Sequence, residues 1–429
     1  MIEIDVDKII SAGEKIADEV EVYVIKTDDL SLEQRESAVS SVFEHSGNSV
    51  YIRLVKDKKI GVSSTSDISR WSDCITSALS SAKLSKPVDE WKGFAEKKAI
   101  TNFENPCDEK IVMSAELASE FLERMKAGAA EHKEARPVSA AVTLLRGESL
   151  LANSNGVYLS RKVSSISLGM DAICENSTGY EYDSSPFLSR VNPEKIGEQT
   201  TFWASASKNC KPIESKKYDV VFSEDVVESL IFGLFSDAVS GKNVLHGKSI
   251  YANKLGESVC AENVSFTDVP SDREGNSWRA FDCEGYPAGN VEIVKNGVLN
   301  SFLYDAKTAA DAKTETTASA QKNSDGSTYI APHNLRVSAP REEVLNRPCL
   351  FVKEVIGAHT ANPLTGEFSV EVANAFLCEN GLFTTPVKKA MLSANVFDIL
   401  QNGFTISAKT KTFDGAVAPK MRISNMQVI

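Results

Sequence analysis

Three of the Asn-Gly dipeptides in this sequence constrain it most strongly, because each is a signal for a tight hairpin turn. They stand at Asn155-Gly156, Asn296-Gly297 and Asn380-Gly381. The second lies between apolar stretches at 290–295 and 298–303, and the third between 375–379 and 382–387. Glycine accepts the positive φ that such turns require, so each dipeptide predicts two antiparallel strands joined by a short turn. A fold rich in antiparallel sheet follows.

The first part of the chain predicts helices on both sides of a small sheet. Apolar residues at helical spacing predict an amphipathic helix over 5–20. Alternation over 50–55, a turn at 56–59 and an apolar start at 60–62 predict successive strands. Helical spacing then returns from Ile68. The predicted order is helix, meander, helix.

The same order recurs further along. An apolar stripe over 111–129, behind Asp108 as N-cap, predicts a helix, and strands follow between 138 and 173. Asn192-Pro193 is typical of an N-cap followed by proline at the first helical position, and predicts a helix to about Ser207. Two units with one order of elements suggest an internal duplication.

From Tyr218 the pattern changes. A strand over 218–222 and a helix over 224–239, capped by Ser223, precede a mostly β region. Residues 307–327 are rich in Ala, Thr, Ser, Asn and Asp, which predicts a long loop that is either functional or a surface insertion. We expect an α+β fold, with two helix-meander-helix units in the N-terminal half and a larger β-rich C-terminal domain.

The expected domain boundaries follow from these patterns. With 429 residues the chain is long enough for two or three domains. Pro87 and Pro106 bound a stretch of mixed charge that suits a linker. The predicted segments are a helix-sheet-helix unit at 1–86, a linker at 87–107, a second such unit at 108–212 and the β-rich domain at 213–429.

Composition excludes some classes of function. Hydrophobic residues make up 42% of the chain, and no apolar run approaches the roughly 18 residues that a membrane span needs. The acidic N-terminus does not resemble a secretory signal, so we expect a cytoplasmic protein whose eight cysteines are buried thiols. A net charge of -12 without a basic stripe argues against direct binding to nucleic acid.

Several segments of the C-terminal half form an ordered set. They are Phe281-Asp282-Cys283-Glu284-Gly285, the hairpin at 295–299, Asn362-Pro363-Leu364-Thr365-Gly366-Glu367-Phe368-Ser369, Glu379-Asn380-Gly381 and Pro386-Val387. In order and spacing this set resembles the TldD/PmbA family of metallopeptidase-related proteins, and within it the PmbA/TldE-like members. The resemblance covers about half of the chain, from Tyr218 onward. The family's older label, modulator of DNA gyrase, is an indirect one.

The resemblance also supplies a test for a metal site. Active TldD-type members carry a His-Glu-x-x-x-His helix that binds zinc, with the glutamate as general base. Counted without gaps, that helix falls on 232–237, where Phe232 and Asp237 replace the histidines and Gly233 replaces the glutamate. The family's C-terminal cysteine ligand is also missing, since the last cysteine is Cys378. We predict no catalytic residues and no metal or cofactor in this chain, with zinc expected in a TldD-like partner.

The resemblance implies a role as the PmbA/TldE-like subunit of a peptidase that acts on flexible peptides, either in a heterodimer with a TldD-like catalytic chain or in a homodimer. Candidate peptide-binding residues are Asp282, Glu284, His359, Thr365 and Gly366. Their alternative role is turn and loop structure, because Asp, Thr and Gly are ordinary turn formers.

Two other functions stay open at this point. The chain could be a self-associating protein that binds peptides or a small ligand without a catalytic partner. It could also keep an unrecognised catalytic site, for example Asp237 with His246. Co-purification separates the first alternative from the peptidase subunit, and metal content tests the second.

Overall fold

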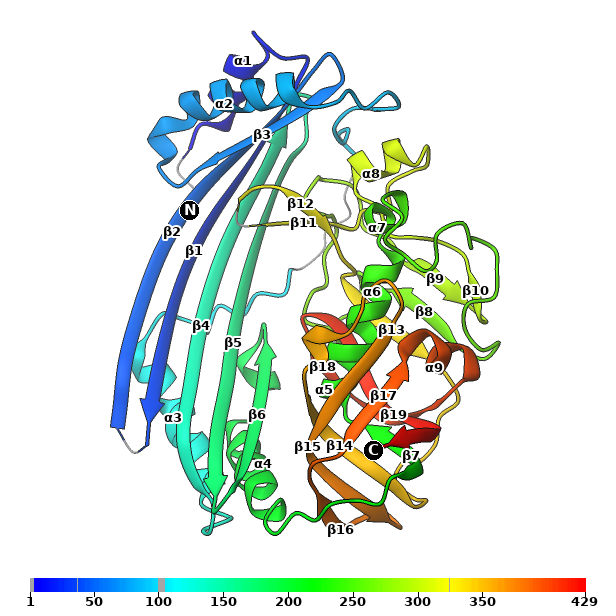
Figure 1. Cartoon of the computed structure of the whole chain (residues 1–429). Helices are drawn as coiled ribbons and strands as arrows, with labels where there is room; N and C mark the ends of the chain where they lie inside the picture. The colour runs from blue at the N-terminus through cyan, green and yellow to red at the C-terminus, as the bar shows by residue number, and fades with distance from the viewer. Residues whose placement is uncertain (1–3, 37, 99–104, 324) are drawn as a thin grey trace.

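The N-terminal half forms one antiparallel sheet of six strands in the order β3-β2-β1-β4-β5-β6 (Figure 1). The computed structural model describes residues 4–36, 38–98, 105–323 and 325–429. The strands of this sheet are β1 Glu19–Arg35, β2 Ala38–Lys56, β3 Lys59–Thr65, β4 Arg136–Asn153, β5 Tyr158–Cys174 and β6 Ser177–Ser185. Pairing of β1 with β4 joins the two predicted units into a single sheet.

Helices cover one face of this sheet at both ends. They are α1 Val6–Gly13, η1 Ile68–Arg70 and α2 Trp71–Leu84 at one end, and α3 Ala115–Ala129, η2 Leu188–Arg190 and α4 Pro193–Ala206 at the other. Val22 and Val24 pack with the first group, and Leu30 and Leu32 with the second. Alternate residues of a strand share a face, so both helix pairs lie on the same side and leave the inner face to the C-terminal part.

Two glycines make the same contact in the two halves of the sheet. A Cβ on Gly61 of β3 would lie 2.0 Å from the carbonyl oxygen of Ala78 in α2. A Cβ on Gly179 of β6 would lie 2.2 Å from the carbonyl oxygen of Thr200 in α4. Each glycine is the third residue of its strand and lets a helix backbone pack directly on the sheet.

Two helices differ from their predicted bounds. The first ends at Gly13 instead of reaching residue 20, because Val20 belongs to β1 and pairs with Leu54. The third begins at Ala115, behind Ser114 instead of Asp108, and the Ser114 hydroxyl accepts a hydrogen bond from the Leu117 amide. In both cases apolar residues beyond the helix still pack in the core, which extends the apparent helical period.

The C-terminal half is the β-rich region that the sequence predicts. Its strands are β7 Lys216–Phe222, β8 Ser265–Asp268, β9 Val291–Lys295, β10 Val298–Leu299, β11 Ala320–Lys322, β12 Thr328–Ile330, β13 Asn334–Ser338, β14 Cys349–Ile356, β15 Glu367–Glu379, β16 Leu382–Val387, β17 Met391–Asn395, β18 Thr405–Phe413 and β19 Gly415–Val428. Strands β7, β14, β15, β17 and β19 close on themselves, because β19 also pairs with β7. A closed barrel leaves no free edge among these strands.

The C-terminal helices are short, except for one that starts directly after β7. They are α5 Glu224–Val226, the π-helical η3 Val227–Phe232, α6 Gly233–Val239, α7 Gly241–Leu245, α8 Ala306–Asp311, η4 Ala358–Thr360 and α9 Val396–Asn402. The long loop predicted over 307–327 is wrong in part: α8 occupies its start, and β11 pairs with β12 to form a hairpin. Asp305 caps α8 through the Thr308 amide, a signal that the polar composition hides.

The predicted hairpin turns are present. Asn296 and Gly297, like Asn380 and Gly381, all have positive φ, as a two-residue type I′ turn requires. The turn at Asn155-Gly156 is wider, since only Gly156 has positive φ and the Asn153 amide bonds to the Val157 carbonyl.

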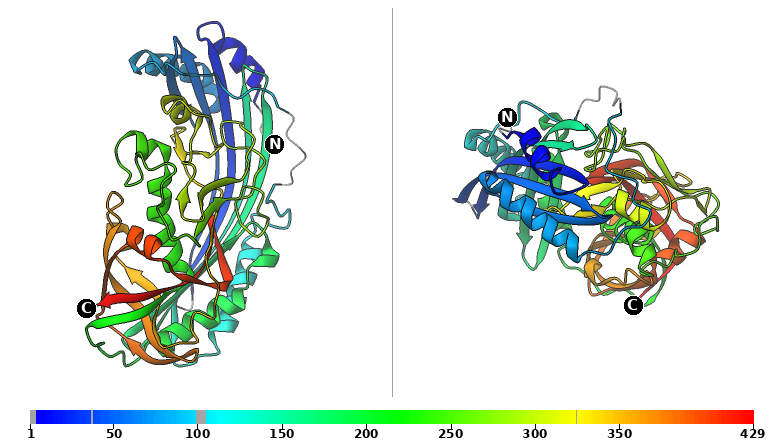
Figure 2. Two further views of the ribbon diagram at one scale, coloured as in Figure 1. Left: turned by 90° about the vertical axis from the view of Figure 1, so that its right-hand side faces the viewer. Right: turned by 90° about the horizontal axis from the view of Figure 1, so that it is seen from above.

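The long sheet curves past one side of the C-terminal half (Figure 2). Part of the segment between α2 and α3 is held against the sheet, since Phe94 and Ala95 are buried. Glu19 accepts hydrogen bonds from Trp91 and from the Phe94 amide, and Asn153 donates to the Ala95 carbonyl. None of the helices in the described part of the chain is both long and apolar enough to cross a bilayer.

Candidate functional site

The helix that carries Phe232, Gly233 and Asp237 runs without a break through α5, η3 and α6. Phe232 is 2% exposed, and its ring lies edge-on to Phe266 with 6.1 Å between centroids. Gly233 and Asp237 are exposed. The π-helical turn η3 ends immediately before Gly233, and such turns are frequent at functional sites.

These residues do not fit a metal ion. A buried phenyl ring and a glycine offer no ligand atom, so Asp237 is the single donor of the three. Within the described ranges, no group of three or more His, Cys, Asp or Glu residues is placed to hold a metal. His246, the suggested partner of Asp237, caps the end of α7, and among the described contacts no ion pair or hydrogen bond joins the two.

Two of the candidate peptide-binding residues are enclosed. Asp282 is 1% exposed, and its carboxylate accepts hydrogen bonds from the amides of Glu284, Tyr286 and Ala320. These hydrogen bonds stabilise the turn within the segment 281–285. In this structure the Asp282 carboxylate is not open to a ligand.

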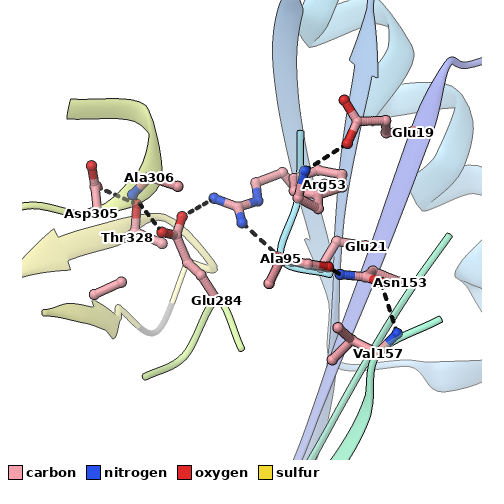
Figure 3. A network of polar contacts seen from close by, with 12 residues as sticks. Glu19, Glu21, Arg53, Ala95, Asn153, Val157, Glu284, Asp305, Ala306 and Thr328 are labelled. Atoms are coloured by element: carbon pink, nitrogen blue, oxygen red, sulfur yellow. Dashed lines mark hydrogen bonds and ion pairs between the residues drawn. The ribbon is translucent and has the colours of Figure 1, made fainter. Parts of the chain in front are cut away.

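Glu284 faces the N-terminal sheet, as Figure 3 shows. Its carboxylate forms an ion pair with Arg53 of β2 and accepts a hydrogen bond of 2.7 Å from the Ala306 amide. Arg53 also pairs with Glu21 of β1 at 2.9 Å. Burial disfavours the charge on Arg53, but the two carboxylates outweigh burial and raise its pKa. The triad therefore fixes the C-terminal half against the sheet.

His359, Thr365 and Gly366 lie in another place, on a turn before β15. His359 and Thr365 are exposed. Gly366 has φ +79° and a Cβ there would lie 2.4 Å from the Phe397 ring, so only glycine suits the position. The Thr365 carbonyl accepts a hydrogen bond from Asn395 at 2.7 Å. The structure thus divides the five candidates between a buried contact and an exposed turn.

A different region offers room for a ligand. A cleft of about 580 Å³ lies between the two halves of the molecule. Its walls come from β6 and α4 on one side, and from β18 and the start of α5 on the other. Glu228 of η3 lines a smaller cavity that shares Tyr182, Asp183 and Lys411 with this cleft. The helix that carries Phe232, Gly233 and Asp237 therefore begins at the cleft.

Four charged residues line this cleft as one cluster. Lys353 lies 2.7 Å from Asp225 and 2.9 Å from Glu181, and Lys411 lies 2.7 Å from Asp225. Burial alone would lower the pKa of Lys353, but Asp225 and Glu181 outweigh it and raise that pKa. Trp203 donates to Glu181 at 3.1 Å. These ion pairs and this hydrogen bond fix the charged side chains of the cleft relative to one another.

Carboxyl groups beside this cluster have raised pKa values. Burial raises the pKa of Glu228, and the charges of Asp225 and Asp414 raise it further. Burial likewise raises the pKa of Asp183 and of Asp414. Carboxyl groups with shifted pKa values in a cleft are a common feature of binding and catalytic sites.

Sequence reasoning missed these residues. Glu181, Trp203, Lys353 and Lys411 come from four different elements, and no short spacing links them. Asp225 stands in the first turn of a predicted helix, where an acid is ordinary. Only the packing of β6 against β18 brings them together.

Comparison with known proteins decides the family. Residues 20–83 match the PmbA/TldA metallopeptidase domain 1, residues 108–207 the central domain, and residues 215–429 the C-terminal domain. The chain belongs to the PmbA/TldD family. The resemblance found in the C-terminal motifs is confirmed and extends to the N-terminal half.

Several relatives of this PmbA/TldD family member match it over almost their whole length. An uncharacterised protein of Methanocaldococcus jannaschii is 26% identical over 412 residues, which cover 94% of this chain and 95% of the relative. Metalloprotease PmbA of Escherichia coli O157:H7 is 23% identical over 432 residues, with 96% and 92% covered. The crystal structure of TldE from Thermococcus kodakarensis shares the fold, with TM-score 0.89, 22% identity and 99% of each chain covered. The metalloprotease names support a peptidase-related role at the level of the family.

Proposed function

We propose that this chain is a PmbA/TldE-like subunit of a cytoplasmic peptidase, without an active site of its own, that pairs with a TldD-like chain carrying the zinc. The observation that carries the proposal is the burial of Phe232 in the core, next to exposed Gly233. Phe232 packs in the core where a catalytic chain has a histidine ligand, and Gly233 offers no side chain where such a chain has its general base. The chemistry then belongs to the partner.

The charged cleft supports a role in holding the peptide. Strand β6 is an edge strand of the N-terminal sheet and lines the cleft. An extended peptide can add to such an edge through backbone hydrogen bonds, which suits substrates that lack structure. Lys411, Lys353 and the carboxylates beside them would position polar parts of that peptide.

An uncovered sheet edge supports the pairing with another chain. Strand β3 pairs with β2 only from Val50 onward, which leaves residues 38–49 at the edge. Val39, Val42 and Phe43 are 54%, 53% and 60% exposed there. At the other side of the sheet, β6 pairs with β5 only from Ile166 onward. There the neighbouring edge of β5 is contacted by the segment before α3, since the Ser164 amide donates to the Pro106 carbonyl. An apolar edge without lysine or proline is prone to pair with another chain.

Purification of the native chain tests this proposal. We expect a tagged chain to bring down a His-Glu-x-x-x-His homologue from its own cells, and peptide hydrolysis to appear only when both chains are present. Zinc should follow the homologue and not the isolated chain. Stoichiometric zinc with hydrolysis in the isolated chain would overturn the proposal. Purification as a homo-oligomer alone, in cells without such a homologue, would favour the self-associating peptide-binding protein.

A further inference from the structure

One arginine of the sheet and one of the C-terminal half lie near enough for the charge of Arg279 to lower the pKa of Arg161. Arg161 stands on β5 and Arg279 in the loop before β9. Neither forms an ion pair within the part of the chain that the structure describes. Burial lowers the pKa of Arg161, and the charge of Arg279 lowers it further. Burial also lowers the pKa of Arg279, although Cys283, Tyr23, Asp268 and Asp282 partly oppose it. Enclosed cations without an ion pair are costly.

The register of the sheet shows where Arg161 points. Arg161 pairs with Ser149, and Ser149 with Ile25, two residues along β1 from Tyr23. Residues paired across antiparallel strands lie on one face, so Arg161 and Tyr23 share a face. It is the inner face, because Val22 and Val24, the neighbours of Tyr23 on β1, pack with the helices on the other face.

The guanidinium group of Arg161 has unused donors. Its Nε is enclosed and has no partner, and among the described hydrogen bonds none is donated by Arg161. Arg279 donates to two neutral oxygens, the Ser277 carbonyl at 3.3 Å and the Gln321 side chain at 2.6 Å. Both arginines are half-buried, so solvent still reaches them. Donors that face shared space without an acceptor suit an anion.

A third cation reaches the same place from the C-terminal half. The hairpin β11–β12 extends to the inner face of the sheet, where Gly326 lies against the Tyr51 ring. Lys322 of β11 lies over the Tyr23 ring, 5.2 Å from its centroid, and forms no ion pair within the described ranges. Gln321, the residue before Lys322, accepts the hydrogen bond from Arg279. Figure 1 shows this hairpin between the sheet and the C-terminal half.

A buried histidine beside the arginines is also left unpartnered on one side. The His333 Nδ1 lies 2.8 Å from the Asp268 carboxylate, and both side chains are fully buried. Its Nε2 has no partner. Burial lowers the pKa of His333 and outweighs the hydrogen bond and the charge of Asp268, which raise it, and the charges of Arg279 and Arg161 lower it further. Asp268 is already engaged, because its carboxylate also accepts hydrogen bonds from the amides of His333 and Asn334.

We propose that Arg161, Arg279 and Lys322 form a binding site for an oxyanion, a carboxylate or a phosphate, on the inner face of the sheet. The anion supplies the missing countercharge between the two halves of the molecule. Guanidinium groups bind such oxygens through paired, charge-assisted hydrogen bonds. The site is independent of the zinc helix and of any catalytic partner. Its ligand is either the carboxylate of a peptide or a free anion.

Titration calorimetry of the full chain with inorganic phosphate tests the site, with sodium chloride at matched ionic strength as the control for screening. We expect one phosphate per chain, and Arg161→Gln and Arg279→Gln to weaken binding by about tenfold or more. Lys162→Gln is the matched control, since Lys162 is the next residue and lies on the opposite face of β5. Phosphate binding that is equal in all variants overturns the site, and so does a parent chain that binds neither phosphate nor the free-acid peptide described below.

Two further measurements separate loss of binding from loss of folding and identify the source of the anion. Arg161→Lys retains the charge and should keep weakened phosphate binding, even where Arg161→Gln fails to fold. A tetra-alanine peptide with a free carboxylate, compared with its amide, distinguishes the sources of the anion. Binding of the free acid alone identifies a peptide carboxylate, and binding of phosphate alone identifies a free anion. Both outcomes support the site, and neither depends on peptidase activity.

Discussion

Arg53 and Glu284 lie 231 residues apart in the sequence and form a fully buried ion pair that joins the N-terminal sheet to the C-terminal half. Glu21 completes a triad, with its carboxylate 2.9 Å from the same guanidinium group. Two carboxylates on one arginine leave net negative charge in a buried place, which the Ala306 amide partly compensates.

Arg53→Met should destabilise the chain strongly, because both glutamates would stay buried without a cation. We expect a loss of about 3–5 kcal/mol in the free energy of unfolding, measured by urea denaturation. Arg70→Met is the control, since Arg70 and Asp73 form an exposed pair. It should leave the unfolding midpoint unchanged. Equal midpoints for the two variants would show that the buried pair does not stabilise the fold.

Gly61→Ala and Gly179→Ala should each cost about 1–3 kcal/mol, because the added methyl group collides with the backbone of the helix packed on the strand. Gly233→Ala is the matched control. Its Cβ would meet nothing nearer than 3.9 Å, and alanine is favoured over glycine in a helix by about 1 kcal/mol. Thermal unfolding should thus rank Gly233→Ala at or above the parent chain. A lower unfolding temperature for Gly233→Ala would contradict the open space at that position. Unchanged unfolding temperatures for Gly61→Ala and Gly179→Ala would contradict the close contact between strand and helix.

Asp225→Asn should change how stability depends on pH. Burial tends to raise the pKa of Asp225, but Lys353 and Lys411 outweigh it, so the pKa is lowered. A lowered carboxyl pKa means that the folded state binds fewer protons than the unfolded state, so its stabilisation is present at neutral pH and is lost as pH falls below about 4. We expect the variant to lose about 1–3 kcal/mol at pH 7 and less at pH 3, in urea titrations at both pH values. An equal loss at both pH values would contradict the ion pairs.

Phe232→His should not restore a metal site. The imidazole would replace a buried ring packed on Phe266, and an enclosed polar group without a partner costs about 2 kcal/mol. Phe232→Leu, which stays apolar, should cost less. Elemental analysis after purification without chelator should find no stoichiometric zinc in either variant. Zinc bound by Phe232→His alone would show that this position still faces a ligand site.

Phe43→Lys should weaken association with another chain through the edge of β2. Lysine at an edge strand opposes pairing, and Phe43 is 60% exposed there. We expect co-purification with the TldD-like chain, or self-association in sedimentation, to fall about tenfold. Leu382→Lys is the control, because Leu382 is 70% exposed at a hairpin in the C-terminal half. Equal association of both variants would place the interface elsewhere.

The local features of the fold were readable from the sequence, and the candidate site was not. Asn192-Pro193 and Ser223 start helices as predicted, and their caps are present. The polar stretch over 307–327 concealed a capped helix and a hairpin, because neither has an apolar period of its own. The cleft of Glu181, Lys353 and Lys411 had no signal, since its residues are more than fifty positions apart.

The sequence by itself determined the turns, the helix caps, the absence of metal-ligand atoms in the side chains of Phe232 and Gly233, and the family. Each of these depends on residues within a few positions of one another or on motifs that stay in order along the chain. Tertiary structure alone decided that Glu284 pairs with Arg53 and that Arg161 meets Arg279. Burial and charge pairing depend on which surfaces pack together, and in this molecule those surfaces belong to halves of the chain that are distant in sequence.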